Sequence, residues 1–249
     1  MIQTGVVSVT FRNLQPAVIV EMAQQAGLSG IEWGGDVHVP HGNVRRAKEV
    51  RKMTLDAGLQ VSSYGSYYKV GRDANTGLFE KVLETAVVLK APSVRVWAGD
   101  RGSDYSDAIW WHKVVEDSRR IAAQAAEVGI TIAFEYHEET LTDTSESACR
   151  LLCEIGLPNV LSYWQPRLNT NLAEQIKGLR AITPWLGNLH VFNQCGAEPG
   201  PLAEGAIQWS QYLDIVRELP GDRFLLLEFV KGDSPSQFLE DAETLRKFM

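Results

Sequence analysis

The chain has 249 residues, of which 45% are hydrophobic and 22% charged, and its formal net charge is −7. This composition is typical of a globular protein, and the length fits a single α/β barrel. The acidic balance argues against a protein that holds nucleic acid through a basic face, and no segment reaches the roughly 20 apolar residues that cross a bilayer.

Short apolar runs, most of them β-branched or aromatic-rich, recur at fairly even intervals along the chain. Their length and composition predict strands rather than helices. In chain order these predicted strands are residues 5–11, 29–33, 59–64, 92–98, 130–136, 159–164, 187–192 and 223–229.

The segments between these strands have the spacing of amphipathic helices, and the last one is SPSQFLEDAETLRKFM at the C-terminus. Gly27, Gly58 and Gly129 each stand just before a strand, where helices commonly end. Eight strand–helix units with parallel pairing predict a (β/α)8 TIM barrel that occupies residues 1–249 as one domain. A doubly wound open sheet is the alternative, but the first strand–helix turn, VTFRNLQ, lacks the glycine-rich dinucleotide fingerprint.

The three cysteines, Cys149, Cys153 and Cys195, show no paired metal-site spacing. An odd number of cysteines and an N-terminus without a secretory signal predict reduced thiols and a cytoplasmic location. The sequence is compatible with a homo-oligomer and does not specify the oligomeric state.

Ionisable residues stand late in three otherwise apolar strands, and in a TIM barrel the C-terminal strand ends carry the reacting groups. They are Glu135, His190 and Glu228. Each could be a chance polar residue that faces the helices, or part of a salt bridge that plugs the barrel. Buried carboxylates are costly unless they are paired or bound to a cation. Two carboxylates and an imidazole together therefore favour a divalent metal with open positions for substrate.

The chain resembles the xylose-isomerase-like TIM barrels, the sugar-phosphate isomerase/epimerase superfamily, over essentially its whole length. The resemblance rests on GLSGIEWGGDVHVP, IAFEYHEETLTDT, LGNLHVFN, PLAEGAIQW and LLLEF. It implies a metal held by Glu135 on the fifth strand, a residue of the sixth, His190 on the seventh and Glu228 on the eighth.

The sixth strand departs from the family pattern, which has Asp followed three residues later by His. In NVLSYWQPRLN the aligned residues are Gln165 and Leu168. Gln165 is kept as a ligand through its neutral amide oxygen. Arg167 could bind a carboxylate or phosphate, or be an ordinary loop charge. The arginine that the ketose 3-epimerases use for substrate falls on Gly196, which weakens that particular assignment.

The resemblance implies an isomerase or epimerase that acts on a small sugar or sugar acid through a metal-stabilised enediolate, with Glu135 and Glu228 as the acid/base pair. The metal would be Mn²⁺, Mg²⁺, Co²⁺ or Zn²⁺. One alternative is a lyase of the same fold, either a dehydratase or a decarboxylase. The other is a non-catalytic barrel whose metal site has eroded.

Five further residues are predicted to contact substrate, since each lies at or beyond a strand end: His38, Tyr64, Trp97, His137 and Arg167. The loops HVPHGN (38–43) and SYYKVG (66–71) are expected to cover the substrate and exclude water. They could equally be ordinary surface loops.

Overall fold

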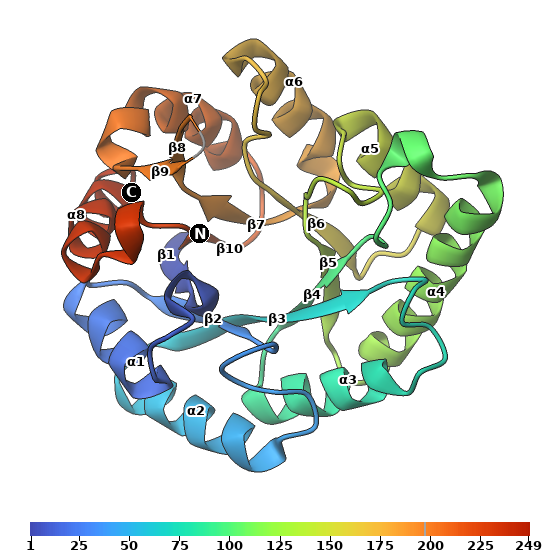
Figure 1. Cartoon of the computed structure of the whole chain (residues 1–249), viewed down its shortest axis with the longest axis horizontal. Helices are drawn as coiled ribbons and strands as arrows, with labels where there is room; N and C mark the ends of the chain where they lie inside the picture. The colour runs from blue at the N-terminus through green and yellow to red at the C-terminus, as the bar shows by residue number, and fades with distance from the viewer. Residues whose placement is uncertain (197) are drawn as a thin grey trace.

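The computed structural model describes residues 1–196 and 198–249. Within these residues, eight parallel strands close into a barrel in the order β1-β10-β7-β6-β5-β4-β3-β2, and the helices surround it (Figure 1). The barrel strands are β1 (Ile2–Val7), β2 (Gly30–Gly34), β3 (Gln60–Lys69), β4 (Ser93–Trp97), β5 (Thr131–Phe134), β6 (Val160–Trp164), β7 (Leu186–Val191) and β10 (Arg223–Leu227). The predicted (β/α)8 barrel is confirmed.

An α-helix follows each barrel strand and packs on the outside of the sheet. The helices are α1 (Pro16–Gln25), α2 (Val44–Asp56), α3 (Leu78–Leu89), α4 (Ala108–Glu127), α5 (Ser145–Ile155), α6 (Leu172–Ile182), α7 (Ala206–Arg217) and α8 (Pro235–Lys247). Short 3-10 helices are η1 (Ser8–Phe11), η2 (Ser103–Tyr105), η3 (Thr183–Trp185), η4 (Leu202–Gly205) and η5 (Lys231–Asp233).

Local sequence signals explain several helix boundaries. The side chains of Asp107 and Thr144 accept hydrogen bonds from backbone N–H groups in the first turns of α4 and α5. Asn171 and Glu174 form a reciprocal capping box at the start of α6. Gly58 and Gly129 have positive φ values of 76° and 71° directly after helices, as the sequence predicted.

Two predicted segments differ from the structure. The first predicted strand, residues 5–11, ends earlier, because Ser8–Phe11 turns into the 3-10 helix η1. The expected loop at 66–71 belongs mostly to β3, which runs to Lys69. A short antiparallel hairpin of β8 (Asn193–Cys195) and β9 (Glu198–Gly200) follows β7 and was not predicted from the sequence.

Inward-facing side chains fill the barrel in layers, because alternate residues of a strand point to the same side. Phe224 and Leu226 occupy the lower interior, where Gly30 and Gly5 leave them space. A side-chain Cβ at Gly30 would lie 2.7 Å from the Phe224 ring, so only glycine fits there. Above this apolar layer the inward positions become polar, and the candidate site lies there.

No helix of the described chain is long and apolar enough to span a membrane.

Candidate metal and substrate site

Four inward-facing residues meet at the C-terminal end of the barrel. Glu135 directly follows β5, Gln165 follows β6, His190 lies near the end of β7, and Glu228 follows β10. One ligand atom from each of Glu135, His190 and Glu228 lies within 4.8 Å of the others, and all three residues are buried. The structure thus brings together the residues that the sequence singled out.

Oxygen atoms surround the Nδ1 atom of His190. Gln165 Oε1 lies 2.9 Å from it, Glu228 Oε2 3.1 Å and Glu135 Oε1 4.0 Å. In neutral imidazole with the proton on Nε2, these four atoms would direct lone pairs at one another. Such an arrangement is stable only if a proton or a cation lies between them.

A charged cluster lies directly below these four residues. Arg95 on β4 donates through Nε to Glu32 Oε1 of β2 at 2.7 Å, and both side chains are essentially inaccessible to solvent. Glu32 Oε2 accepts hydrogen bonds from Ser63 at 2.6 Å and from Tyr163 at 2.9 Å. Although burial opposes ionisation of Glu32, Arg95 and His190 hold the pKa of this carboxyl well below its ordinary value.

Arg95 also connects this cluster to the site above. Its Nη1 group donates to Glu135 Oε2, and the indole Nε1–H of Trp97 donates to the same oxygen. These two donors fix one oxygen of Glu135 and leave Oε1 facing His190. Glu135 is therefore oriented by two neighbours on β4.

The sum of the buried charges is consistent with a divalent cation. Arg95 balances Glu32, and the charges of Glu135 and Glu228 remain. Within the described residues, Glu228 Oε2 and His190 Nε2 are buried polar atoms without a hydrogen-bond partner. His190 Nε2 points toward Glu32, with 3.8 Å to Oε1. A carboxylate on that side favours the tautomer that leaves Nδ1 free for a metal.

These donors are compatible with Mn²⁺, Mg²⁺, Co²⁺ or Zn²⁺, because the carboxylate and amide oxygens suit Mg²⁺ and Mn²⁺ and the imidazole suits a transition metal such as Zn²⁺. When no cation is bound, a proton on His190 can lie between the imidazole and the surrounding oxygen atoms. Burial opposes that proton, but Glu228 and Glu32 outweigh burial and raise the pKa of His190 above its ordinary value. For Glu228 itself, burial and the charge of Glu32 oppose ionisation, but His190 and Arg95 outweigh them and lower its pKa below the ordinary value.

A cavity of about 200 Å³ opens from these residues toward solvent. Its walls include Glu135, Gln165 and Glu228, the predicted substrate contacts His137 and Arg167, and the apolar side chains Leu168, Phe192 and Phe229. Trp97 reaches this region through its bond to Glu135, and its indole stacks on the His137 ring with centroids 4.4 Å apart.

The structure does not bring His38 or Tyr64 to the cavity. His38 is buried, and its two ring nitrogens pair with Ser8 Oγ at 3.0 Å and the Leu14 carbonyl at 3.2 Å. Tyr64 is also buried and donates its hydroxyl proton to the Val39 carbonyl at 2.7 Å. Both side chains hold the segment after β2 against the barrel. They therefore do not form the cover over the substrate cavity that the sequence had suggested.

Several residues near the site were not assigned to it from the sequence. Glu32 and Arg95 were visible as charged residues near strand ends, yet their mutual contact depends on the closure of the barrel. The sequence signal for them was that Glu32 and Arg95 occupy inward-facing positions of their strands, as Trp97 does on β4. Phe229 shows no such signal: it has a positive φ of 59°, unusual for an aromatic residue, and packs against Phe192 at the mouth.

Comparison with known proteins gives consistent matches. A family model described as xylose isomerase-like TIM barrel matches residues 20–248. A 3-dehydroshikimate dehydratase from Bacillus anthracis is 26% identical over 245 residues, which cover 85% of this chain and 84% of that protein.

Two solved structures show the same fold. One is a probable 3-DHS dehydratase involved in petrobactin synthesis from Bacillus anthracis, with a TM-score of 0.84, 21% identity and 98% of each chain covered. The other is a D-psicose 3-epimerase from Clostridium cellulolyticum H10 with D-tagatose, with a TM-score of 0.75, 15% identity and coverage of 98% of this chain and 97% of that chain.

Proposed function

The chain belongs to the xylose isomerase-like TIM barrel family, and on that premise we propose that it is a divalent-metal-dependent isomerase or epimerase of a small hydroxylated carbonyl compound, a sugar or sugar acid. The observation that carries the proposal is the convergence of three buried residues, Glu135, His190 and Glu228, with one ligand atom of each within 4.8 Å of the others. Enzymes among its relatives, a dehydratase and an epimerase, support catalysis on this fold.

The proposed ligands are Glu135, Gln165, His190 and Glu228. A divalent cation bound there would supply Lewis acidity to a carbonyl and an adjacent hydroxyl of the substrate, which acidifies the C–H bond between them. Arg95 and Trp97 would keep Glu135 oriented. Glu228 Oε2 carries no hydrogen bond from the described residues. It would be the freer of the two carboxylates to take a proton from carbon, and Glu135 the partner that returns one.

The cavity above the ligands would hold the substrate. His137, with the Trp97 indole stacked on its ring, would form one wall, and Leu168, Phe192 and Phe229 would form an apolar rim that limits the access of water. Exclusion of water would protect an enediolate from side reactions. Arg167 lines the same cavity and would attract a carboxylate if the substrate carries one.

A dehydratase is the second candidate, and the 26% identical 3-dehydroshikimate dehydratase favours it. Both reactions begin by removal of a proton next to a carbonyl, and they differ in whether a hydroxyl then leaves.

Incubation in D2O tests both candidates. Mn²⁺-loaded protein is incubated with a panel of ketohexoses and, separately, with 3-dehydroshikimate, and NMR follows deuterium uptake at carbon and loss of water. Epimerised, deuterated ketohexose supports the first candidate, and dehydration of 3-dehydroshikimate supports the second. Two results together would show that the proposed catalytic function is wrong. One is that neither compound class exchanges a proton for deuterium, and the other is that Glu135→Gln binds Mn²⁺ as tightly as wild type.

A further inference from the structure

A second and larger hollow adjoins the cavity above the proposed ligands. Its volume is about 660 Å³, against about 200 Å³ for the first. Ligand pockets usually measure about 300–1,000 Å³, so the smaller cavity alone is restricted to a very small ligand. The two hollows share five lining residues, namely Pro166, Arg167, Leu168, Phe192 and Gln194. A molecule that reacts in the first could therefore extend into the second.

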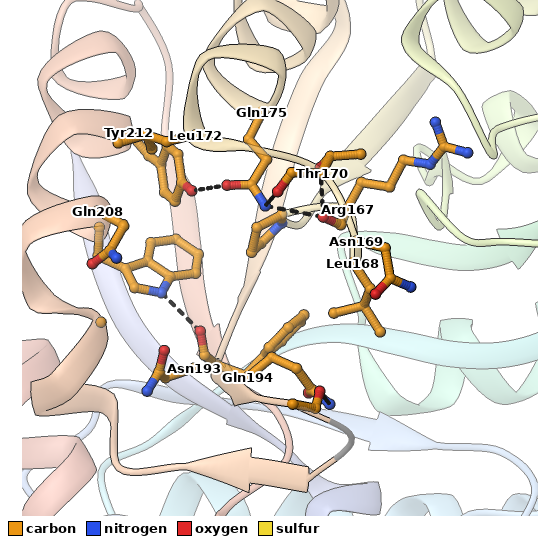
Figure 2. A pocket seen from close by; sticks show the side chains of 15 residues that line it. Arg167, Leu168, Asn169, Thr170, Leu172, Gln175, Asn193, Gln194, Gln208 and Tyr212 are labelled. Atoms are coloured by element: carbon orange, nitrogen blue, oxygen red, sulfur yellow. Dashed lines mark hydrogen bonds between the residues drawn. The ribbon is translucent and has the colours of Figure 1, made fainter.

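The lining of the larger hollow, which we name the amide groove, is almost uncharged. It is formed by the segment after β6, the start of α6, the β8 strand and the start of α7, which meet around it in Figure 2. Arg167 is the one charged side chain among its described lining residues, and Figure 2 shows that its guanidinium group is directed away from the groove. The groove is lined by five side-chain amides: Asn169, Gln175, Asn193, Gln194 and Gln208.

Two of these amides serve the structure. Gln175 accepts from the Tyr212 hydroxyl at 2.5 Å and donates to the carbonyls of Arg167 at 2.9 Å and Thr170 at 3.3 Å. Figure 2 shows these bonds, which attach the loop after β6 to α6 and α7. Asn193 donates to the Pro201 carbonyl at 2.9 Å. These bonds give the groove a defined wall.

The remaining amides have hydrogen-bonding capacity to spare. Gln194 donates only to the Gly196 carbonyl, at 3.1 Å, and its carbonyl oxygen stays free within the described chain. Gln208 and Asn169 are exposed, and no side-chain hydrogen bond joins either of them to the described residues. They come from two different elements, α7 and the β6–α6 loop, and Figure 2 places them on opposite sides of the groove.

The chemistry of this lining selects one kind of ligand. A side-chain amide both donates and accepts, as a hydroxyl group does, and it offers no charge. A phosphate or carboxylate would find no cation directed into the groove. An apolar group would displace water from the exposed amides of Asn169 and Gln208 without replacing its hydrogen bonds, which is costly. A neutral group with several hydroxyls satisfies both requirements.

We propose that the amide groove is a second sugar subsite: it binds a neutral glycosyl unit attached to the sugar that reacts above Glu135, His190 and Glu228. The preferred substrate is then a glycoside or disaccharide, which binds more tightly than the corresponding free monosaccharide. This inference rests on the proposed function, because it extends the substrate of the same site.

The test compares disaccharides with their component monosaccharides by isothermal titration calorimetry on the Mn²⁺-treated protein. The probes are maltose, cellobiose, lactose and sucrose, with glucose, galactose and fructose as their units. At least one disaccharide should bind about 10-fold more tightly than its units, as one or two additional neutral hydrogen bonds would provide. If every disaccharide binds no better than its units, the subsite proposal is wrong.

The variants Gln208→Ala and Asn169→Gly locate the effect. Glycine is chosen at 169 because Asn169 has a φ of 58°. The double variant should abolish the 10-fold preference and leave monosaccharide affinity unchanged. Gln211→Ala is the matched control, an exposed glutamine of the same helix that lines a different hollow. Its preference should equal that of wild type, and an equal loss in the control and the double variant would overturn the assignment.

Mn²⁺ binding separates the two proposals, since none of these three residues lies among the proposed ligands. A preference for disaccharides in a protein that binds no Mn²⁺ would leave the subsite standing and remove the metal-dependent function. Tight Mn²⁺ binding without any such preference would remove the subsite alone.

Discussion

Replacement of Arg95 by methionine tests how the charged layer beneath the site is balanced. Arg95 is 1% exposed and contacts two buried carboxylates, Glu32 and Glu135. Methionine fills similar space without the charge. The Arg95→Met variant leaves Glu32, which is fully inaccessible, with only hydroxyl partners and His190. We expect the variant to fold with a large loss of stability.

The size of that loss follows from the ionisation of Glu32. Without Arg95, burial is opposed only by His190 and Ser63, and we expect the folded variant to hold at pH 7 a proton that the unfolded chain releases near the ordinary value of 4.5. Uptake of that proton costs about 1.4 kcal/mol per pH unit, or about 3 kcal/mol over the interval from 4.5 to 7. Measurements on other buried ion pairs with one partner removed give about 3–5 kcal/mol.

Urea unfolding at pH 7 and at pH 5 measures this loss. The wild-type pKa of Glu32 is lowered, so its stabilisation is present above 4.5 and is lost only as the pH falls below that value. The proton that Glu32 takes up in the variant costs less as the pH approaches 4.5. The difference in stability between wild type and Arg95→Met should therefore shrink from pH 7 to pH 5. The double variant Arg95→Met/Glu32→Gln should recover part of the stability. If the single variant lies within about 1 kcal/mol of wild type, or if the double variant is less stable than the single, Arg95 does not compensate the buried charge of Glu32.

Three further predictions concern the metal site and its surroundings. Gln165→Asp should strengthen Mn²⁺ binding in a titration of the metal-free proteins, because it adds a third carboxylate to the proposed ligands, and weaken binding of an anionic substrate; equal Mn²⁺ affinities would exclude Gln165 as a ligand. Mn²⁺ affinity should fall about 10-fold per pH unit below pH 6.5, since the raised pKa of His190 means that a proton competes for the ligand; a flat profile would contradict the role of His190. Asp117→Ala should lower the free energy of unfolding by about 2–4 kcal/mol, because Tyr68 and the Gly71 N–H both donate to Asp117; unchanged Mn²⁺ affinity in the same variant checks that the effect is structural.

The barrel could be predicted from the sequence because its signals are local. Each strand is a short apolar run, and helix ends are fixed by single residues such as Gly58 and Asp107 within one turn. The β8–β9 hairpin was missed because NQC and EPG carry no apolar alternation. Its pairing follows from the position of the chain above β7 rather than from β propensity.

The proximity of Glu135, His190 and Glu228 was predictable for a similar reason, since strand ends converge in any closed parallel barrel, whereas Gln165 was placed with them by the family resemblance. The ion pair of Arg95 with Glu32 was not predictable. The two residues are 63 apart in sequence, and their strands, β2 and β4, lie on either side of β3, so their contact depends on how both strands pair with β3. His38 was misjudged in the other direction. A histidine beyond a strand end looked available to substrate, while in the structure Ser8 and Leu14 occupy both ring nitrogens.

The central claim is that Glu135, Gln165, His190 and Glu228 hold one divalent ion, and anomalous diffraction from crystals soaked in MnCl2 tests it most directly. We expect a single strong peak at about 2.0–2.4 Å from carboxylate oxygens of Glu135 and Glu228 and from His190 Nδ1. The same peak should disappear in crystals of Glu228→Gln soaked identically. A map without a peak among these residues at saturating Mn²⁺, with the imidazole of His190 hydrogen-bonded to Glu228 in its place, would contradict the account.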